Sequence, residues 1–460
     1  MTRTVILVAA LALTGIGAAI VYQAATRDRD YRTSLARGDT ALGNEQTFGA
    51  IEAYSGAIAL RPDSMLAHLR RGETYQRRGD LEAAARDFRT AAALDLSATR
   101  PLDELGDVLY QQRRFQRAAE IYERCLRLDD RSARVGYKLA LARYHDGNLD
   151  AALAALAGTV RLNDRMADAH YLEGICLRET GRPREAQRAL EKAVALAPGL
   201  IAAREELADL YSSLGRRVDE IAQLEIVAGL DRDRVERQVA VGLAQARAGH
   251  PELAVLTLGS TLERSPDQPI IYAALGRIWF DIAQAHSDRP DALAKALEAL
   301  ARVAPTNVAT SDILTVYGRA LLLSGQVDAA ERTLQQATER YPLDATAFLR
   351  YATVAERQNH LDAARRALIA YGTLVADDEE FLPRATRIAT LSLRVNDVQA
   401  AIAWLERAVA VSPNDATLLV ALADAQIRAG NRPGAEATIS RALRKDPQNA
   451  ALLAQSRRLH

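Results

Sequence analysis

The sequence predicts an all-α solenoid built from about twelve helix-turn-helix repeats. Two observations predict this fold class. Hydrophobic residues make up 49% of the 460 residues and are mostly Ala and Leu, which favour helices, whereas aromatic residues make up only 5%. In addition, small residues recur at intervals of 34, a period typical of stacked helical pairs.

The 34-residue interval is clearest at one small residue, which we number position 8 of each repeat. The interval is constant through the first eight repeats and resumes after two breaks. The residues at position 8 are Gly38, Gly72, Gly106, Ala140, Gly174, Ala208, Gly242, Gly276, Gly318, Ala352, Ala389 and Ala423. A glycine or alanine at each of these places predicts that two helix backbones approach closely there.

The second helix of each repeat shows a matching pattern. Position 20 is alanine in all repeats except at Glu220 and Leu293. Position 24 is always large and apolar: Tyr54, Phe88, Tyr122, Leu156, Leu190, Leu224, Leu258, Leu297, Leu334, Leu368, Leu405 and Ile439. We expect this large residue to fill the gap between neighbouring repeats, with a glycine near position 15 ending the first helix and a proline at position 32 ending the second.

Three insertions interrupt the register. We place about five extra residues between Gly276 and Leu293, about three near 305–312, and about three near 376–381. Longer loops cost little free energy, so simple loop growth is one interpretation. A local kink or a docking loop is the other.

The pattern resembles the tetratricopeptide repeat (TPR) family over residues 31–448. This resemblance implies a right-handed α-α superhelix whose usual role is to bind protein segments. It also implies that residues 449–460 form a helix that caps the array.

Residues 1–30 carry one early charge, Arg3, and then no charged residue from Thr4 to Thr26. A single-pass transmembrane anchor is our first interpretation, because such a stretch could cross a bilayer as a helix. A cleaved secretory signal is the alternative. The short leader favours an array on the exported, periplasmic side, although four arginines after the segment favour the cytoplasm.

Charge and motifs argue against several functions. The 59 basic residues balance the 59 acidic ones, so nucleic acid is not an expected partner. His170 and Cys176 are six residues apart and project from different faces of a helix, so they do not form a catalytic pair. We interpret both cysteines as structural, and we expect no metal, no cofactor and no enzymatic activity.

In the TPR family the first helices line a concave groove, chiefly through positions 2, 5, 9 and 12. Position 9 changes along the chain from acidic to apolar and then to basic residues. Our candidate groove residues are Tyr110, Tyr137, Leu141, Tyr144, Tyr171, Ile175, Arg277 and Arg319. The tyrosines either contact a peptide or merely cover neighbouring helices, and both interpretations stay open.

The predicted function is a non-enzymatic, membrane-tethered scaffold that binds a protein or peptide segment in this groove. Assembly of an envelope or secretion complex is the role that anchor and array suggest together. One alternative is a regulatory adaptor that recruits a protease or a synthase. Another is a polysaccharide-export protein that stacks glycan on the tyrosines.

Overall fold

The computed structural model describes residues 2–286, 289–375, 380–444, 447–448 and 450–459, with side chains from Ala19 onward except at 455, 458 and 459. Within these ranges the regular structure is entirely helical, without a strand. The predicted all-α class is therefore confirmed. Two compact units share the chain, residues 1–223 and 224–460, and the division lies within helix α12.

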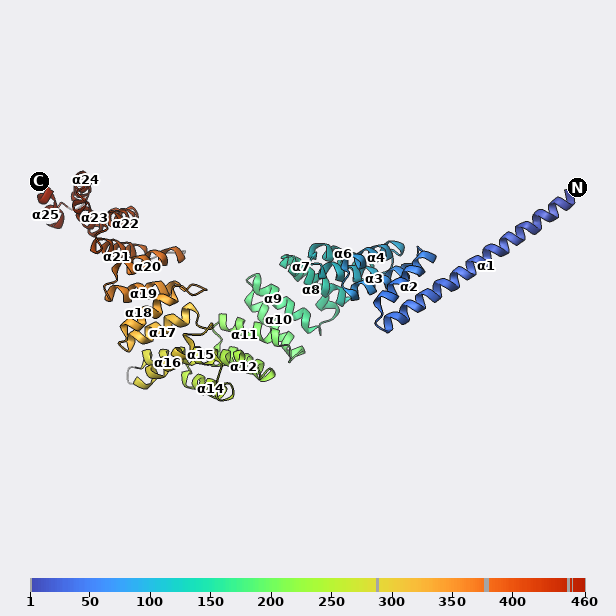
Figure 1. Ribbon diagram of the computed structural model, residues 1–460, viewed down its shortest axis with the longest axis horizontal. Helices are drawn as coiled ribbons and strands as arrows, with labels where there is room; N and C mark the ends of the chain where they lie inside the picture. Colours follow the sequence, from blue (N-terminus) through green and yellow to red (C-terminus); the bar gives the residue numbers. More distant parts are fainter. Residues whose placement is uncertain (1, 287–288, 376–379, 445–446, 449, 460) are drawn as a thin grey trace. The chain divides into compact units, whose positions relative to one another are not determined.

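Helices in the first unit follow one another in antiparallel pairs, and each pair packs on the next (Figure 1). Their bounds are α1 Thr2–Gly43, α2 Thr47–Leu60, α3 Met65–Arg78, α4 Leu81–Leu94, α5 Arg100–Gln111, α6 Phe115–Leu128, α7 Ala133–His145, α8 Leu149–Leu162, α9 Ala167–Glu179, α10 Pro183–Leu196, α11 Ile201–Ser213 and α12 Arg217–Leu230.

The second unit repeats the same arrangement. Its helices are α13 Val235–Arg247, α14 Pro251–Arg264, α15 Pro269–Ala285, α16 Pro290–Val303, α17 Ser311–Leu323, α18 Val327–Ala337, α19 Ala345–Arg357, α20 Leu361–Leu374, α21 Phe381–Arg394, α22 Val398–Val411, α23 Ala416–Arg428, α24 Arg432–Leu443 and α25 Ala450–Leu459. The last of these packs on α24 and buries Leu452. Its role as a cap stays a prediction.

Turn residues explain where the first helices begin and end. Helix α3 starts after Ser64, whose Oγ accepts a hydrogen bond from the Ala67 amide at 3.1 Å. It ends at Gly79, which has a φ of 85°, a left-handed conformation that glycine adopts without strain. The predicted glycines near position 15 all have such a positive φ: Gly79, Gly147, Gly181, Gly215, Gly249, Gly325 and Gly430.

In the repeats that have glycine at position 8, this glycine packs against a large side chain of the second helix. A Cβ added to Gly72 would lie 2.7 Å from the Phe88 ring, and one added to Gly174 would lie 2.6 Å from Leu190 Cγ. Real Cβ atoms do not come this close to a neighbour, so a side chain at either of these glycines would push the two helices of its repeat apart. The predicted role of the small residue is therefore correct.

The repeat that begins at α15 shows one error in the predicted register. Gly276 packs against Leu300, with a Cβ-to-Cγ distance of 2.6 Å, and not against Leu297. Leu300 and Ala296 are buried, so they take positions 24 and 20 in place of Leu297 and Leu293. With this correction, position 20 is again alanine in this repeat.

The corrected register replaces two expected insertions by one. Helix α15 has 17 residues, whereas α13 and α17 have 13 each, so the extra residues lie at the end of α15 and in the turn before α16. From Leu300 to Gly318 the spacing is that of an uninterrupted repeat. The insertion expected near 305–312 is therefore wrong, and the third one falls largely on 376–379, outside the described residues.

The predicted membrane anchor is a second error. In the part of the chain that the structure describes, no helix is both long and apolar enough to span a bilayer. The N-terminal segment instead opens α1, a helix of 42 residues that continues through charged positions into the first repeat. Arg27 donates a hydrogen bond to the Leu60 carbonyl at 2.6 Å, and Asp28 pairs with Arg61. The localisation inferred from an anchor, and the membrane as a partner, are withdrawn with it.

Candidate functional site

Four of the predicted groove tyrosines lie on three successive first helices of the first unit. Tyr110 is near the end of α5, Tyr137 and Tyr144 are on α7, and Tyr171 is on α9. All four are half-buried. We call the surface formed by these four residues with Leu141 and Ile175 the tyrosine face.

Tyr137 lies on α7, which follows the helix of Tyr110 and precedes that of Tyr171 in the order of first helices. Burial raises the pKa of its hydroxyl, and the nearby Asp168 raises this pKa further. Tyr110 and Tyr171 make smaller contributions in the same direction. Burial likewise raises the pKa of Tyr110 and of Tyr171. The structure therefore places these three predicted residues on three successive first helices, α5, α7 and α9.

Aromatic side chains gather at one end of this face. The Tyr110 ring centroid lies 5.3 Å from that of Phe115 and 5.6 Å from that of His145. His145 is stacked on Phe115 at 5.1 Å and lies edge-on to Tyr144 at 5.2 Å. Such contacts hold the rings in place and reduce the conformational entropy lost on binding.

Leu141 on α7 and Ile175 on α9 are half-buried residues of the tyrosine face. Leu141 packs, with Tyr137 and Tyr144, against a core cluster that includes Leu172. Tyr144 donates a hydrogen bond to a Glu179 carboxylate oxygen at 3.1 Å. The tyrosines thus cover neighbouring helices and keep part of each ring accessible, so the two interpretations of these residues are not exclusive.

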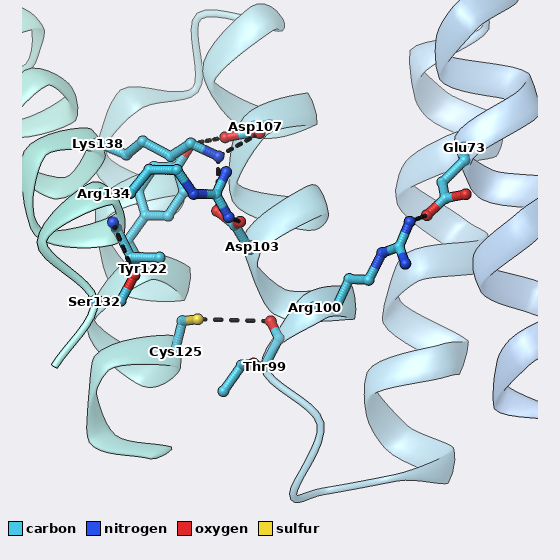
Figure 2. A network of polar contacts seen from close by, with 11 residues as sticks. Glu73, Thr99, Arg100, Asp103, Asp107, Tyr122, Cys125, Ser132, Arg134 and Lys138 are labelled. Carbon is cyan, nitrogen blue, oxygen red and sulfur yellow. Dashed lines mark hydrogen bonds and ion pairs between the residues drawn. The ribbon is translucent and has the colours of Figure 1, made fainter. Parts of the chain in front are cut away.

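An ion-pair ladder joins the first helices α3, α5 and α7 (Figure 2). Lys138 Nζ lies 2.7 Å from Asp103 and 2.6 Å from Asp107, and Arg134 also pairs with Asp103. Tyr122 donates a hydrogen bond to Asp107 at 2.6 Å. One repeat earlier, Arg100 pairs with Glu73 at 2.6 Å.

The acidic residues at position 9 of the first three repeats all form ion pairs. Asp39 lies 3.8 Å from Arg70, which also pairs with Glu73 at 3.2 Å. Asp39, Glu73 and Asp107 therefore each pair with a basic residue of the next repeat. These pairs join consecutive first helices, so the acidic character expected for this part of the surface is largely compensated.

Family models give the identity of the repeat. Models described as tetratricopeptide repeat match residues 35–101, 104–167, 167–200, 315–373 and 393–457, which together exceed half of the chain. The chain belongs to the tetratricopeptide repeat family. The predicted TPR solenoid is thereby confirmed, and TPR proteins generally mediate protein-protein interactions and peptide binding.

One curated protein is similar in sequence to part of this chain. Small glutamine-rich tetratricopeptide repeat-containing protein 2 of Mycosarcoma maydis is 30% identical over 94 residues, which are 20% of this chain and 27% of that protein. The chain thus spans about a quarter of that relative's length.

Two solved TPR structures are also similar. One, from Parabacteroides merdae, is 16% identical with a TM-score of 0.40 and covers 54% of this chain and 97% of its own. The other is YrrB, a TPR protein with an unusual peptide-binding site, which is 22% identical with a TM-score of 0.36 and covers 41% of this chain and 97% of its own. Family membership rests on the family models alone.

The two predicted basic residues of this TPR chain lie in the second unit, apart from the tyrosines in sequence. Arg277 on α15 forms an ion pair with Asp312, with N-to-O distances of 2.7 and 3.2 Å. Arg319 on α17 donates to Gln284 at 3.0 Å and lies 4.9 Å from the centre of the Phe280 ring. Burial lowers the pKa of Arg319, as does the like charge of Arg350.

Phe115 and His145 were missed by the sequence analysis, although a signal for His145 was present. Several contacts between consecutive first helices join residues 35 apart, one repeat plus one residue, as in Tyr144 with Glu179 and Arg277 with Asp312. Tyr110 and His145 have the same separation. This spacing would have added His145 to the candidate residues, whereas no spacing rule identifies Phe115.

The cysteines behave as predicted. Both are free and buried, and burial raises the pKa of each thiol to about 11. His170 does not contact Cys176, because its ring nitrogens bond to the Asp164 carbonyl at 2.9 Å and Glu173 at 3.4 Å.

Proposed function

We propose that this TPR protein is a non-enzymatic scaffold that holds a segment of another protein along the tyrosine face. One observation carries the proposal: Tyr110, Tyr137, Tyr144 and Tyr171 lie on the first helices of three successive repeats and are each partly accessible, and the rings of Tyr110 and Tyr144 both contact that of His145. Tyrosine offers a large contact area at a low cost in conformational entropy, and its hydroxyl bonds to a peptide backbone.

The immobilised rings support a binding role. Tyr110 contacts the rings of Phe115 and His145. Tyr144 contacts His145 and donates a hydrogen bond to Glu179. A preorganised surface loses less entropy when a partner docks. Arg277 and Arg319 stay a separate prediction, and Arg277 is already satisfied by Asp312.

The role in an envelope or secretion complex depended on the anchor and is not retained. A regulatory adaptor would use the same tyrosine face, so the identity of the captured protein separates an adaptor from an assembly scaffold. A glycan would also stack on tyrosines, and the test below includes it as an outcome.

The test places a photoreactive phenylalanine analogue at position 175 of the full-length protein in cells. The control carries the same analogue in place of Lys192, an exposed residue on the second helix α10. We expect mass spectrometry to find a protein crosslink at position 175 that the control lacks. The crosslink should weaken when Tyr137 and Tyr171 are both changed to Ala.

Two results would contradict the proposal. Equal protein crosslinking from both positions would show that the tyrosine face has no preferred role. Retention of polysaccharide without any protein adduct at position 175 would favour the glycan hypothesis. Circular dichroism of the double tyrosine variant checks that its helices are intact.

A further inference from the structure

A cavity lies between the second helices α4 and α6 and the first helix α5. Its volume is about 500 Å³. Leu105 and Leu109 of α5 form a buried floor, with Ala92 of α4 and Ile121 of α6 beside them. We call it the second-helix pocket.

Leu96 forms the lip of the second-helix pocket and is 68% exposed. It occupies position 32, where many other repeats carry the proline that ends the second helix. A large apolar side chain held in solvent beside an apolar cavity is not explained by packing within the repeat. Such a combination is typical of a surface that another molecule covers.

Arginines surround the opening of the pocket. Arg89 of α4 and Arg117 and Arg124 of α6 line it, together with a single acid, Glu120. Arg117 and Arg124 are seven residues apart, so they share one face of α6. All three arginines are exposed. Within the described residues, none of the three forms a hydrogen bond or an ion pair, whereas nearby Arg114 pairs with Glu82 at 2.8 Å.

A neighbouring cavity of the first unit lacks this excess of positive charge. The next cavity along the chain, between α6, α7 and α8, has a volume of about 390 Å³ and contains one charge of each sign, Asp130 and Arg161. The same helix packing therefore produces a cavity without the arginine cluster. That neighbouring cavity provides a matched control.

We propose that the second-helix pocket binds a segment of another protein that inserts an apolar side chain flanked by carboxylates. The guanidinium group binds carboxylates through paired hydrogen bonds, so three unpaired arginines around an apolar floor select an acidic, amphipathic segment. Glu120 sets a register, because a carboxylate of the partner is repelled there. A cavity of about 500 Å³ accommodates one or two large side chains.

This site is independent of the tyrosine face. It lies on α4, α5 and α6, and its opening is formed by second helices, whereas the tyrosines project from first helices. One chain could therefore hold two partners, or two segments of one partner, at the same time.

Binding is measured by fluorescence anisotropy with full-length protein and two labelled peptides of about 14 residues. One peptide carries Leu at every third or fourth position with Glu on either side, and the other replaces each Glu by Lys. We expect only the Glu peptide to bind. The double variant Arg117→Glu and Arg124→Glu should weaken this binding about tenfold, because two favourable charge pairs become repulsive.

Matched variants locate the site. Leu96→Glu should weaken binding of the Glu peptide to a similar extent. Arg161→Glu at the neighbouring cavity and Tyr137→Ala on the tyrosine face should leave the affinity for this peptide unchanged. Leu96→Cys bearing a benzophenone should crosslink the Glu peptide, and Leu162→Cys should not. The two native cysteines are buried, so they do not take up the label.

Three outcomes would overturn the proposal. The first is no binding of the Glu peptide at millimolar concentration. The second is equal binding by the double arginine variant and the parent. The third is a preference for palmitate over the peptide, which would make the occupant a lipid. The substituted residues are exposed except for the half-buried Tyr137, and circular dichroism checks that each variant is folded.

Discussion

Gly174 lies so close to Leu190 that a Cβ on residue 174 would be 2.6 Å from the Leu190 Cγ atom. The same glycine-to-large-residue contact recurs at Gly72 with Phe88, Gly242 with Leu258 and Gly318 with Leu334. It sets the distance between the two helices of a repeat. The 34-residue period of the sequence therefore reflects one contact, between a small residue of the first helix and a large side chain of the second, that recurs along the chain.

The first prediction concerns this contact. Gly174→Leu should lower the free energy of unfolding by about 1–3 kcal/mol, because the added side chain overpacks against Leu190. Gly158→Leu on α8 is the control, since a Cβ at residue 158 meets nothing within 4 Å. Urea denaturation of both variants measures the difference. Equal stability of Gly174→Leu and the parent would show that the contact is not tight.

The corrected register of the α15–α16 repeat gives the second prediction. Leu300→Ala should destabilise the protein by about 2–5 kcal/mol, because it leaves a cavity beside Gly276. Leu297→Ala should cost less, since Leu297 is only half-buried. Thermal unfolding followed by circular dichroism compares the two. A larger loss for Leu297→Ala would restore the register with two insertions.

The ion-pair ladder gives the third prediction. Lys138→Met removes the ammonium group between Asp103 and Asp107, and Asp103 is buried. We expect a loss of about 1–3 kcal/mol, because a buried carboxylate loses a charged partner and keeps only Arg134. Lys192→Met, at an exposed site that has no ion pair with any described residue, should change the urea midpoint little.

If the ladder were only a surface feature, Lys138→Met and Lys192→Met would have equal effects. A difference that disappears in 1 M salt would lead to the same conclusion, because exposed pairs are screened and buried ones are not.

The fourth prediction follows from the buried thiols. Burial raises the pKa of Cys125 and Cys176 from 9.0 to about 11. The folded state therefore favours the protonated thiol. The contribution of each thiol to the free energy of unfolding is complete below pH 9 and is lost as the pH rises through about 11. Urea midpoints measured between pH 8 and 11 should fall more steeply for the parent than for a Cys125→Ala, Cys176→Ala variant.

Thiol reactivity offers an independent check of the same shift. At pH 8 the folded protein should react slowly with a disulfide reagent, because both thiols are buried and protonated. In urea both should react at the rate of an unhindered thiol. Rapid reaction in the folded state would contradict the burial of these residues.

The sequence by itself determined the architecture of this protein. Position 8 and position 24 recur because each repeat must bring two backbones together, and that requirement is local to about 34 residues. The turn glycines are readable for the same reason, since a left-handed residue such as Gly79 is fixed by its own backbone conformation. The candidate tyrosines on successive helices also followed from the period.

Only the tertiary structure decided what depends on contacts between repeats. Both Leu297 and Leu300 fit an apolar helical pattern. Only the structure shows that Leu300 is the one that packs against Gly276. The partners of Asp39, Glu73 and Asp107 lie in the following repeat, so composition at position 9 could not show that these charges are compensated. The apolar run that suggested an anchor proved to open α1, a helix that continues into the first repeat, and hydropathy alone does not register that continuation. The second-helix pocket exists because α4, α5 and α6 meet around it, and packing of this kind has no signature in a linear pattern.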